Sequence, residues 1–227
     1  MPIRFRDCVA LLAALGSSAI ASAGSAQDSG FAESGALVFG ADRLFGVLHT
    51  SATIGEDAAE TTNSSTEISL LTRGAESASP YAAPRLTFDG FVTDGISLGG
   101  TLGVTSQSVE IDPPIGMDQD GPSETAVIIG GRIGYGHMFS DAVGIWPKLG
   151  LTYFTDSLED SDGDEIDISG LALSADVMLV IAPVPHFGFT IGPVLDLGLT
   201  GSTEIGATDV DTTVTDVGLL AGLAGWL

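Results

Sequence analysis

Large apolar residues alternate with small or polar residues along most of this chain. From Phe187 to Thr200 the odd positions hold only Phe, Ile, Pro and Leu, whereas the even positions hold Gly, Thr, Val and Asp. The same period of two runs through Ile96–Thr105 and, with Trp146 placed among the small and polar residues, through Val143–Tyr153. Because successive side chains of a β-strand point to opposite faces, the pattern predicts strands with one broad apolar face.

The alternating segments are longer than the strands of most soluble domains. Strands in globular proteins usually have about five or six residues, whereas a tilted strand needs about nine to eleven residues to cross a bilayer. No segment after residue 26 has a convincing helical period. The alternation predicts eight strands, at residues 36–55, 81–92, 95–109, 124–139, 142–155, 167–182, 186–201 and 212–227.

The links between these strands alternate in length. Thr93–Asp94, Ser140–Asp141 and Pro183–Pro185 are short, whereas the other links are long. Outer-membrane barrels combine short periplasmic turns with longer extracellular loops. The sequence therefore predicts an all-β fold, an antiparallel up-and-down transmembrane β-barrel of eight strands with both ends on the periplasmic side. The long links cover residues 56–80, 110–123, 156–166 and 202–211.

The link over residues 56–80 has two interpretations. Glu67–Thr72 reads E-I-S-L-L-T and has the composition of a strand. It either begins the second strand, with Gly74–Pro80 as an insertion, or forms a small hairpin within the loop. The sequence leaves this path open.

The first residues have the order of an export signal. Arg4 and Arg6 precede the apolar run Val9–Ile20, and the small residues A-S-A-G-S-A follow it. This order is typical of a secretory signal peptide. A short membrane anchor is the alternative, but the apolar run is too short to span a bilayer.

We therefore expect a signal peptide at residues 1–26 and an outer-membrane β-barrel domain at residues 27–227. Cleavage would follow Ala26 or, as the alternative, Ala23. The chain would pass through the periplasm and become an integral protein of the bacterial outer membrane. The one cysteine, Cys8, lies in the expected signal peptide, so neither disulfides nor thiol chemistry are expected in the exported domain.

Acidic residues dominate the charge of the chain and gather in the long links. The chain has 30 Asp and Glu against 7 Lys and Arg, a formal net charge of −23. Seven of the acidic residues lie between Asp156 and Asp167. The predicted barrel therefore has an acidic rim at its extracellular end. Nucleic acid is not expected as a partner, because binding phosphate needs a basic patch.

The few charges within the predicted strands fall opposite the large apolar residues. A charge on the lipid-facing side would cost a few kcal/mol at the bilayer midplane. The pattern predicts a charge network in the lumen, which in an eight-stranded barrel has just enough room for its own side chains. Asp42 and Arg43 are adjacent, so both can point inward only across a bulge. The residues predicted for the lumen network are Arg85, Asp89, Arg132, Lys148, Asp176, Asp196 and Asp216.

Aromatic residues gather near the predicted short turns. Membrane proteins carry aromatic belts where the bilayer meets water, although aromatic residues also favour strands in general. The clustering predicts an aromatic girdle formed by Phe91, Phe139, Trp146, Phe187, Phe189 and Trp226.

The most acidic link contains a spacing that calcium sites often use. Asp160, Asp162 and Asp164 alternate within D-S-L-E-D-S-D-G-D-E-I-D-I-S. An EF-hand loop starting at Asp160 needs glycine and glutamate where Glu165 and Leu171 stand. A hairpin turn on the Asp-Gly pair fits better. Weak divalent-cation binding by the loops remains a hypothesis, and no other cofactor is expected.

Catalysis would need a histidine held by hydrogen-bonding partners. Beyond the expected signal peptide the histidines are His49, His137 and His186, and the first of these lies beside Thr50 and Ser51. A Ser–His hydrolase needs the pair within hydrogen-bond reach and a third group that orients the base. The sequence shows no such group, so we predict no catalytic residue and no enzyme activity.

The chain after residue 26 resembles the small bacterial outer-membrane β-barrel proteins with an eight-stranded, OmpA/OmpX-like architecture. The resemblance lies in the segments I-S-L-G-G-T-L-G-V-T, W-P-K-L-G-L-T-Y-F, P-H-F-G-F-T-I-G-P-V-L-D-L-G-L and V-G-L-L-A-G-L-A-G-W-L. Such proteins typically end in an aromatic residue, whereas here Trp226 precedes a final Leu227. The resemblance implies contact with outer-membrane lipid, recognition of the C-terminal strand by the barrel-assembly machinery, and a monomer.

These features lead us to expect a non-enzymatic outer-membrane barrel whose acidic extracellular loops serve an envelope-structural or surface-interaction role. A narrow channel or a barrel that carries a small ligand is the alternative, because a glycine-rich inner face leaves some space. A lipid-modifying barrel enzyme and a secreted soluble β-barrel are further alternatives. The sequence names no ligand or partner.

Overall fold

The computed structural model describes residues 30–55, 60–70, 79–111, 119–159, 165–206 and 208–227. The expected signal peptide lies outside these ranges. Within them, no helix is long and apolar enough to cross a membrane. The elements are β1 (Leu37–Ile54), β2 (Thr61–Leu70), the 3-10 turn η2 (Pro80–Ala82), β3 (Arg85–Thr93), β4 (Ile96–Ile111), β5 (Gln119–Tyr135), β6 (His137–Ser140), β7 (Val143–Glu159), β8 (Glu165–Val184), β9 (Phe187–Ile205) and β10 (Thr208–Trp226).

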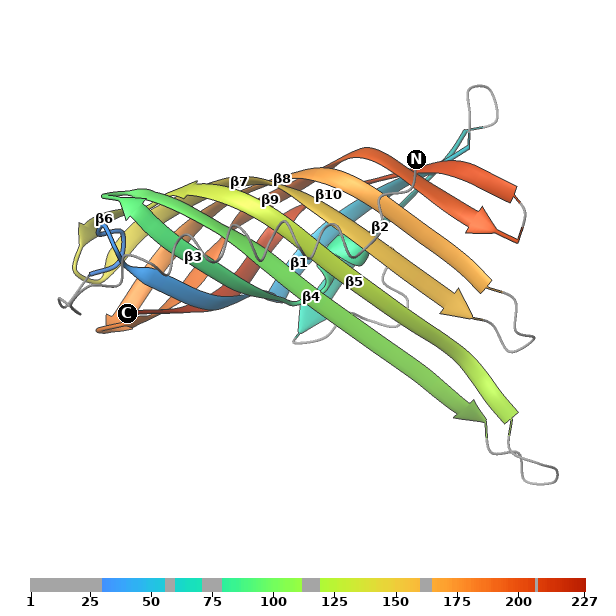
Figure 1. Cartoon of the computed structure of the whole chain (residues 1–227), viewed down its shortest axis with the longest axis horizontal. Helices are drawn as coiled ribbons and strands as arrows, with labels where there is room; N and C mark the ends of the chain where they lie inside the picture. The colour runs from blue at the N-terminus through green and yellow to red at the C-terminus, as the bar shows by residue number, and fades with distance from the viewer. Residues whose placement is uncertain (1–29, 56–59, 71–78, 112–118, 160–164, 207) are drawn as a thin grey trace.

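The strands form one antiparallel sheet that closes on itself (Figure 1). Of its ten strands, β2 and β3 share one edge of β1, and β5 and β6 share one edge of β7, so the wall has eight strand positions. β10 pairs back with β1 from Val38↔Trp226 to Ile54↔Thr212. Closure of the ring gives backbone groups hydrogen-bonding partners in neighbouring strands, which a hydrocarbon environment demands. The predicted eight-stranded barrel is therefore confirmed.

Several strands run further than the alternation predicts. β8 has 20 residues, and β9 and β10 have 19 each. The ladder between β9 and β10 continues to Ile205↔Thr208, through a segment expected to be loop. We attribute the difference to polar outer halves, because a strand with water on both faces carries no apolar alternation. The links expected at residues 156–166 and 202–211 were therefore predicted too long.

The chain between β1 and β3 follows the first of the two expected paths, because β2 begins the second strand of the wall and an insertion interrupts that strand before β3. β2 pairs with the outer half of β1, from Phe45↔Leu70 to Ile54↔Thr61. β3 resumes the same edge of β1 at Arg85, opposite Asp42, because the residues just before it turn into the barrel. Ser79 and Tyr81 are 0% and 1% exposed there. The strand predicted from residue 81 is thus shorter at its start.

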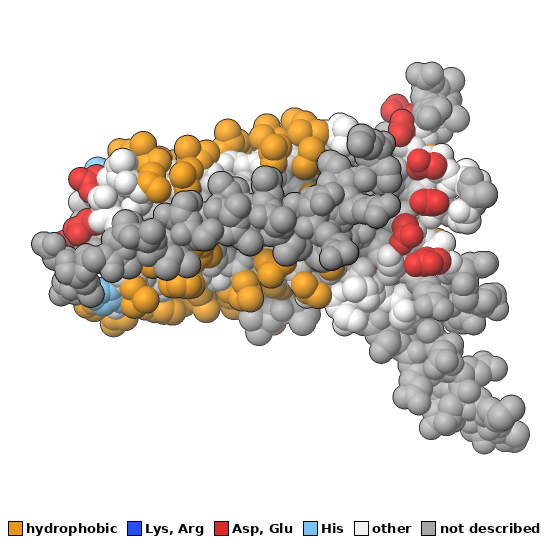
Figure 2. Space-filling view, viewed as in Figure 1, with side chains coloured by type: hydrophobic (Ala, Val, Ile, Leu, Met, Phe, Trp, Pro, Cys, Tyr) orange, Lys and Arg blue, Asp and Glu red, His pale blue; other side chains and the backbone are white. Residues whose placement is uncertain are grey.

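Large apolar side chains form a band on the outside of the barrel (Figure 2). On β9 they run from Phe187 to Leu199, with exposed fractions between 37% and 47%. At about 3.3 Å per residue and a tilt of about 40°, this stretch covers roughly 30 Å along the barrel axis, the thickness of a bilayer core. Beyond Leu199 the outward residues become polar, with Thr200 and Glu204 exposed. We call this polar end, where the long links lie, the outer end, and the opposite end the short-turn end.

Candidate functional site

Nine charged side chains fill the middle of the barrel. Asp89, Asp196 and Asp216 are 0% exposed, and even the most exposed member, Asp176, has a side chain only 13% exposed. All the residues predicted for the lumen network are among them, together with two that the prediction left out. The nine are Asp42 and Arg43 on β1, Arg85 and Asp89 on β3, Arg132 on β5, Lys148 on β7, Asp176 on β8, Asp196 on β9 and Asp216 on β10.

Arg132 and Lys148 connect one side of this network. Arg132 donates to both carboxylate oxygens of Asp89, and its Nη1 lies 2.7 Å from Oδ2 of Asp42. Lys148 Nζ donates to the same Asp42 oxygen at 3.0 Å and lies 3.8 Å from Asp176. Asp42 is therefore shared between two cations.

Arg43 connects the other side. It pairs with Asp196 through two hydrogen bonds, of 2.5 and 3.0 Å, and lies 3.8 Å from Asp176. Arg43 and Arg85 each donate to the backbone carbonyl of Tyr81 at 2.7 Å. The chain segment that turns inward is thus anchored by the charges beneath it.

A β-bulge explains how Asp42 and Arg43 both point inward. Ala41 pairs with Leu223 and Phe45 with Ala221, so β1 uses two more residues than β10 over this interval. Arg43 has φ 62°, a left-handed conformation that is uncommon for a residue other than glycine. The sequence signal for these missed network residues is a pair of opposite charges that breaks the alternation.

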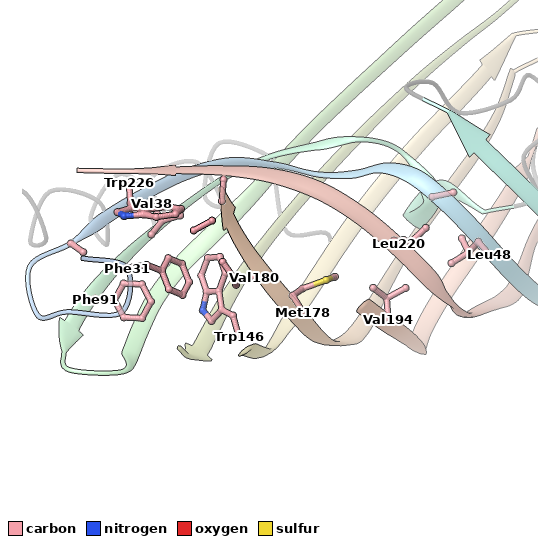
Figure 3. Packing of buried hydrophobic residues seen from close by; sticks show 14 residues of the cluster. Phe31, Val38, Leu48, Phe91, Trp146, Met178, Val180, Val194, Leu220 and Trp226 are labelled. Carbon is pink, nitrogen blue, oxygen red and sulfur yellow. The ribbon is translucent and has the colours of Figure 1, made fainter. Parts of the chain in front are cut away.

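Aromatic side chains close the interior at the short-turn end (Figure 3). Phe91, Trp146 and Trp226 are 2%, 1% and 5% exposed, and each ring centroid lies 5.3 Å from that of Phe31. Trp146 also donates its indole N–H to Ser97 Oγ at 3.1 Å. We call these four rings the aromatic plug.

The aromatic plug corrects the predicted girdle. Phe91, Trp146 and Trp226 have the same parity as the inward charges on their strands, so they face the lumen rather than lipid. A position near a turn fixes the level of a residue along the barrel axis. It does not decide whether the side chain points into the lumen or toward lipid. The other predicted girdle residues, Phe139, Phe187 and Phe189, are 63%, 37% and 47% exposed and lie on the outside.

A second apolar cluster covers the charges toward the outer end. Its centre is Tyr81 of η2, whose ring centroid lies 4.9 Å from that of Phe154. A small cavity of about 20 Å³ is lined by charged residues of the network and by the hydroxyl side chains of Thr101, Thr152 and Ser174. Such a space holds about one or two water molecules. The cluster consists of Tyr81, Ala83, Ile128, Phe154, Ala172 and Val214.

The histidines lie outside this interior. His49 is exposed on β1, where its Nδ1 shares a hydrogen bond of 2.9 Å with Thr66 Oγ1. His137 stacks edge-on against Phe139, and His186 lies in the turn before β9, with its Nδ1 3.1 Å from the Trp226 carbonyl. These positions place the three imidazoles apart, at separate points of the barrel surface.

No group of three or more metal-ligating side chains occurs among the described residues. The aspartates proposed as weak calcium ligands lie outside the described ranges, so this proposal stays a prediction. They are Asp160, Asp162 and Asp164.

Neither protein-family models nor curated protein sequences match the chain. Among solved structures, outer membrane protein OprG from Pseudomonas aeruginosa matches 86% of this chain and 97% of its own, with a TM-score of 0.50 and 13% identity. Neisserial surface protein A matches 84% and 98%, at a TM-score of 0.49 and 15% identity. Ail, the attachment invasion locus protein of Yersinia pestis, matches 84% and 99%, at 0.39 and 13%. At such identities the similarity is one of fold.

Proposed function

We propose that this chain, a small bacterial outer-membrane β-barrel of the eight-stranded OmpA/OmpX-like architecture, is a non-enzymatic and non-conducting protein that works through its acidic outer end. The observation that carries this proposal is the filled interior. The aromatic plug, the charge network and the Tyr81 cluster lie one above another along the barrel axis. A solute would have to displace paired charges to pass, and breaking a buried pair costs about 3–5 kcal/mol.

The surface charge supports a role in surface interaction. The described basic residues, Arg43, Arg85, Arg132 and Lys148, all lie in the interior. Exposed charges that remain on the described surface are acidic, and many gather at the outer end (Figure 2). A surface of one sign attracts ligands of the opposite sign, so the outer end suits a cationic partner. The exposed acidic residues of the outer end include Glu60, Glu165, Asp167, Glu204, Asp209 and Asp211.

Cysteine labelling tests the location and orientation. The chain has one cysteine, in the expected signal peptide, so an introduced thiol would be the single target. We expect Asp209→Cys at the outer end to react with a membrane-impermeant maleimide on intact cells. Asp94→Cys in a short turn is the matched control and should react only after the membrane is opened. Equal labelling of both on intact cells, or labelling of neither after opening, contradicts the proposal.

Polycation binding tests the interaction role. Fluorescent polylysine should bind vesicles that contain the wild-type barrel in a salt-sensitive way. The triple variant Glu204→Gln, Asp209→Asn, Asp211→Asn removes three exposed negative charges from adjoining strand ends and should bind less. Binding that is independent of both salt and these substitutions would argue against an electrostatic surface role.

A further inference from the structure

The charge network holds more carboxyl groups than basic groups. Of its nine ionisable side chains, four are basic and five are aspartates. Two of the basic groups are matched one to one by carboxylates. Arg132 binds both carboxylate oxygens of Asp89, and Arg43 makes two hydrogen bonds to Asp196. These two pairs are therefore balanced in charge.

The other two basic groups balance two more carboxylates. Lys148 Nζ lies 3.0 Å from Asp42 and 3.8 Å from Asp176. Arg85 lines the same small cavity as these two aspartates and donates to a backbone carbonyl. The fifth carboxyl group is that of Asp216, so the network has one surplus negative charge if every member is ionised.

Asp216 is the carboxyl group that has no basic partner. It is 0% exposed, and among the described residues no basic group lies within ion-pair distance of it. Its Oδ2 is hydrogen-bonded to the hydroxyl of Ser79, whereas its Oδ1 has no hydrogen-bond partner. Thr50, directly opposite on β1, presents another hydroxyl. Because hydroxyl groups both donate and accept hydrogen bonds, they suit a neutral carboxylic acid.

The surroundings of Asp216 oppose a negative charge. Asp196 lies directly opposite on β9, between two outward leucines of the apolar band, so hydrocarbon surrounds the barrel at this level. Arg43 of β1 also faces Asp216 but is bound to Asp196, and Tyr81 of η2 adds a neutral phenol. An unpaired ionised carboxylate is costly in such a place, and of two carboxyl groups that share a site one tends to keep its proton.

We propose that Asp216 is a proton-binding site, held as the neutral acid, and that its proton fastens the segment that turns into the barrel, residues 79–83. With this proton the network has equal numbers of positive and negative charges. Ser79 Oγ is hydrogen-bonded to the Asp216 carboxyl group and accepts from the Tyr81 N–H at 3.1 Å. Tyr81 is the centre of the apolar cluster that covers the network. Loss of the proton places a second anion beside Asp196 and should loosen this segment.

Infrared spectroscopy tests the protonation state on the barrel refolded in a detergent that has no carbonyl group. At about pH 6 exposed carboxyl groups are ionised, so a band from a protonated carboxyl C=O reports a buried acid. We expect this band in the wild type and in Asp209→Asn, an exposed control, but not in Asp216→Asn. A wild-type spectrum without the band, or an unchanged band in Asp216→Asn, overturns the proposal.

Urea unfolding at the same pH gives a second measure. Asparagine has nearly the shape of a neutral aspartic acid, so Asp216→Asn should keep the unfolding midpoint of the wild type. Asp196→Asn should lower the midpoint, because the guanidinium of Arg43 then loses its carboxylate. Equal losses for the two variants would show that Asp216 is an ionised member of the network, which contradicts the proposal.

Amide exchange of residues 79–83 tests the fastening of the inward segment. Asp216→Asn cannot ionise, so comparing it with the wild type at each pH cancels the chemical pH dependence of exchange. We expect the two proteins to exchange alike at about pH 6 and the wild type to exchange several-fold faster in alkaline buffer. Exchange that stays equal in alkaline buffer would show that the proton does not hold this segment.

Discussion

Arg43 on β1 and Asp196 on β9 form a two-point ion pair inside the barrel, with Nη1–Oδ2 and Nη2–Oδ1 separations of 2.5 and 3.0 Å. The two side chains are 3% and 0% exposed. Arg43 points inward because of the bulge in β1. This bulge therefore brings the guanidinium into contact with Asp196 of β9, a strand that does not pair with β1. The same guanidinium also binds the Tyr81 carbonyl at 2.7 Å, which ties the inward segment to the network.

Removing this cation should destabilise the barrel. Arg43→Met leaves the buried carboxylate of Asp196 without its ion-pair partner, and uncompensated buried charges cost about 3–5 kcal/mol. Urea unfolding from lipid vesicles, followed by the heat-dependent gel shift, measures the change in free energy of unfolding. Asp209→Asn, at an exposed position on β10, is the control and should change it little. Equal stabilities for the two variants would show that the pair contributes nothing.

Phe31 should be a major anchor of the short-turn end. Its ring contacts three other aromatic rings at 5.3 Å, so Phe31→Ala leaves a cavity among them. Loss of a buried phenylalanine typically costs about 3–5 kcal/mol. The same unfolding assay serves, with Phe139→Ala as the matched control because that side chain is 63% exposed. A larger effect at Phe139 would contradict the packing described.

The tryptophans should be shielded from lipid. Both tryptophans of the chain, Trp146 and Trp226, lie inside the barrel, so lipids brominated on their acyl chains should quench the native fluorescence weakly. Phe187→Trp, made with Trp146→Phe and Trp226→Phe, puts the single fluorophore on the outside, where quenching should be strong. Strong quenching of the native protein would show that the tryptophans contact lipid, as the predicted girdle requires.

Two glycines should differ in their tolerance of an added methyl group. A Cβ at Gly192 would collide with the backbone of Val177 and Met178 on the neighbouring strand, whereas one at Gly131 would meet nothing within 4 Å. Overpacking of this kind costs about 1–3 kcal/mol. Gly192→Ala should therefore lower the free energy of unfolding, and Gly131→Ala should not. Similar values for both would mean that β8 and β9 are less closely packed than described.

The alternation of large apolar with small or polar residues was enough to predict the barrel and to predict that the charged side chains of its strands point into the lumen. Arg132 and Asp89 belong to different strands, but each lies opposite large apolar neighbours, and the structure brings them into contact. The alternation did not predict the structure where the chain departs from regular strand geometry. The bulge at Arg43 and the inward turn at Tyr81 depend on contacts between residues far apart in sequence, which a local pattern does not contain. Trp146 has the same place in the alternation as Lys148, and this alternation, not closeness to a turn, decides that its side chain points inward.

Conductance of a single barrel in a planar bilayer tests the closed interior most directly. The chain without its expected signal peptide would be refolded into lipid, checked for its heat-dependent gel shift, and added to the bilayer under an applied voltage. The stacked aromatic plug, charge network and Tyr81 cluster predict no unitary current steps. Reproducible steps of uniform size from the wild-type protein would show that ions pass through the interior, and would contradict a barrel that works only through its outer end.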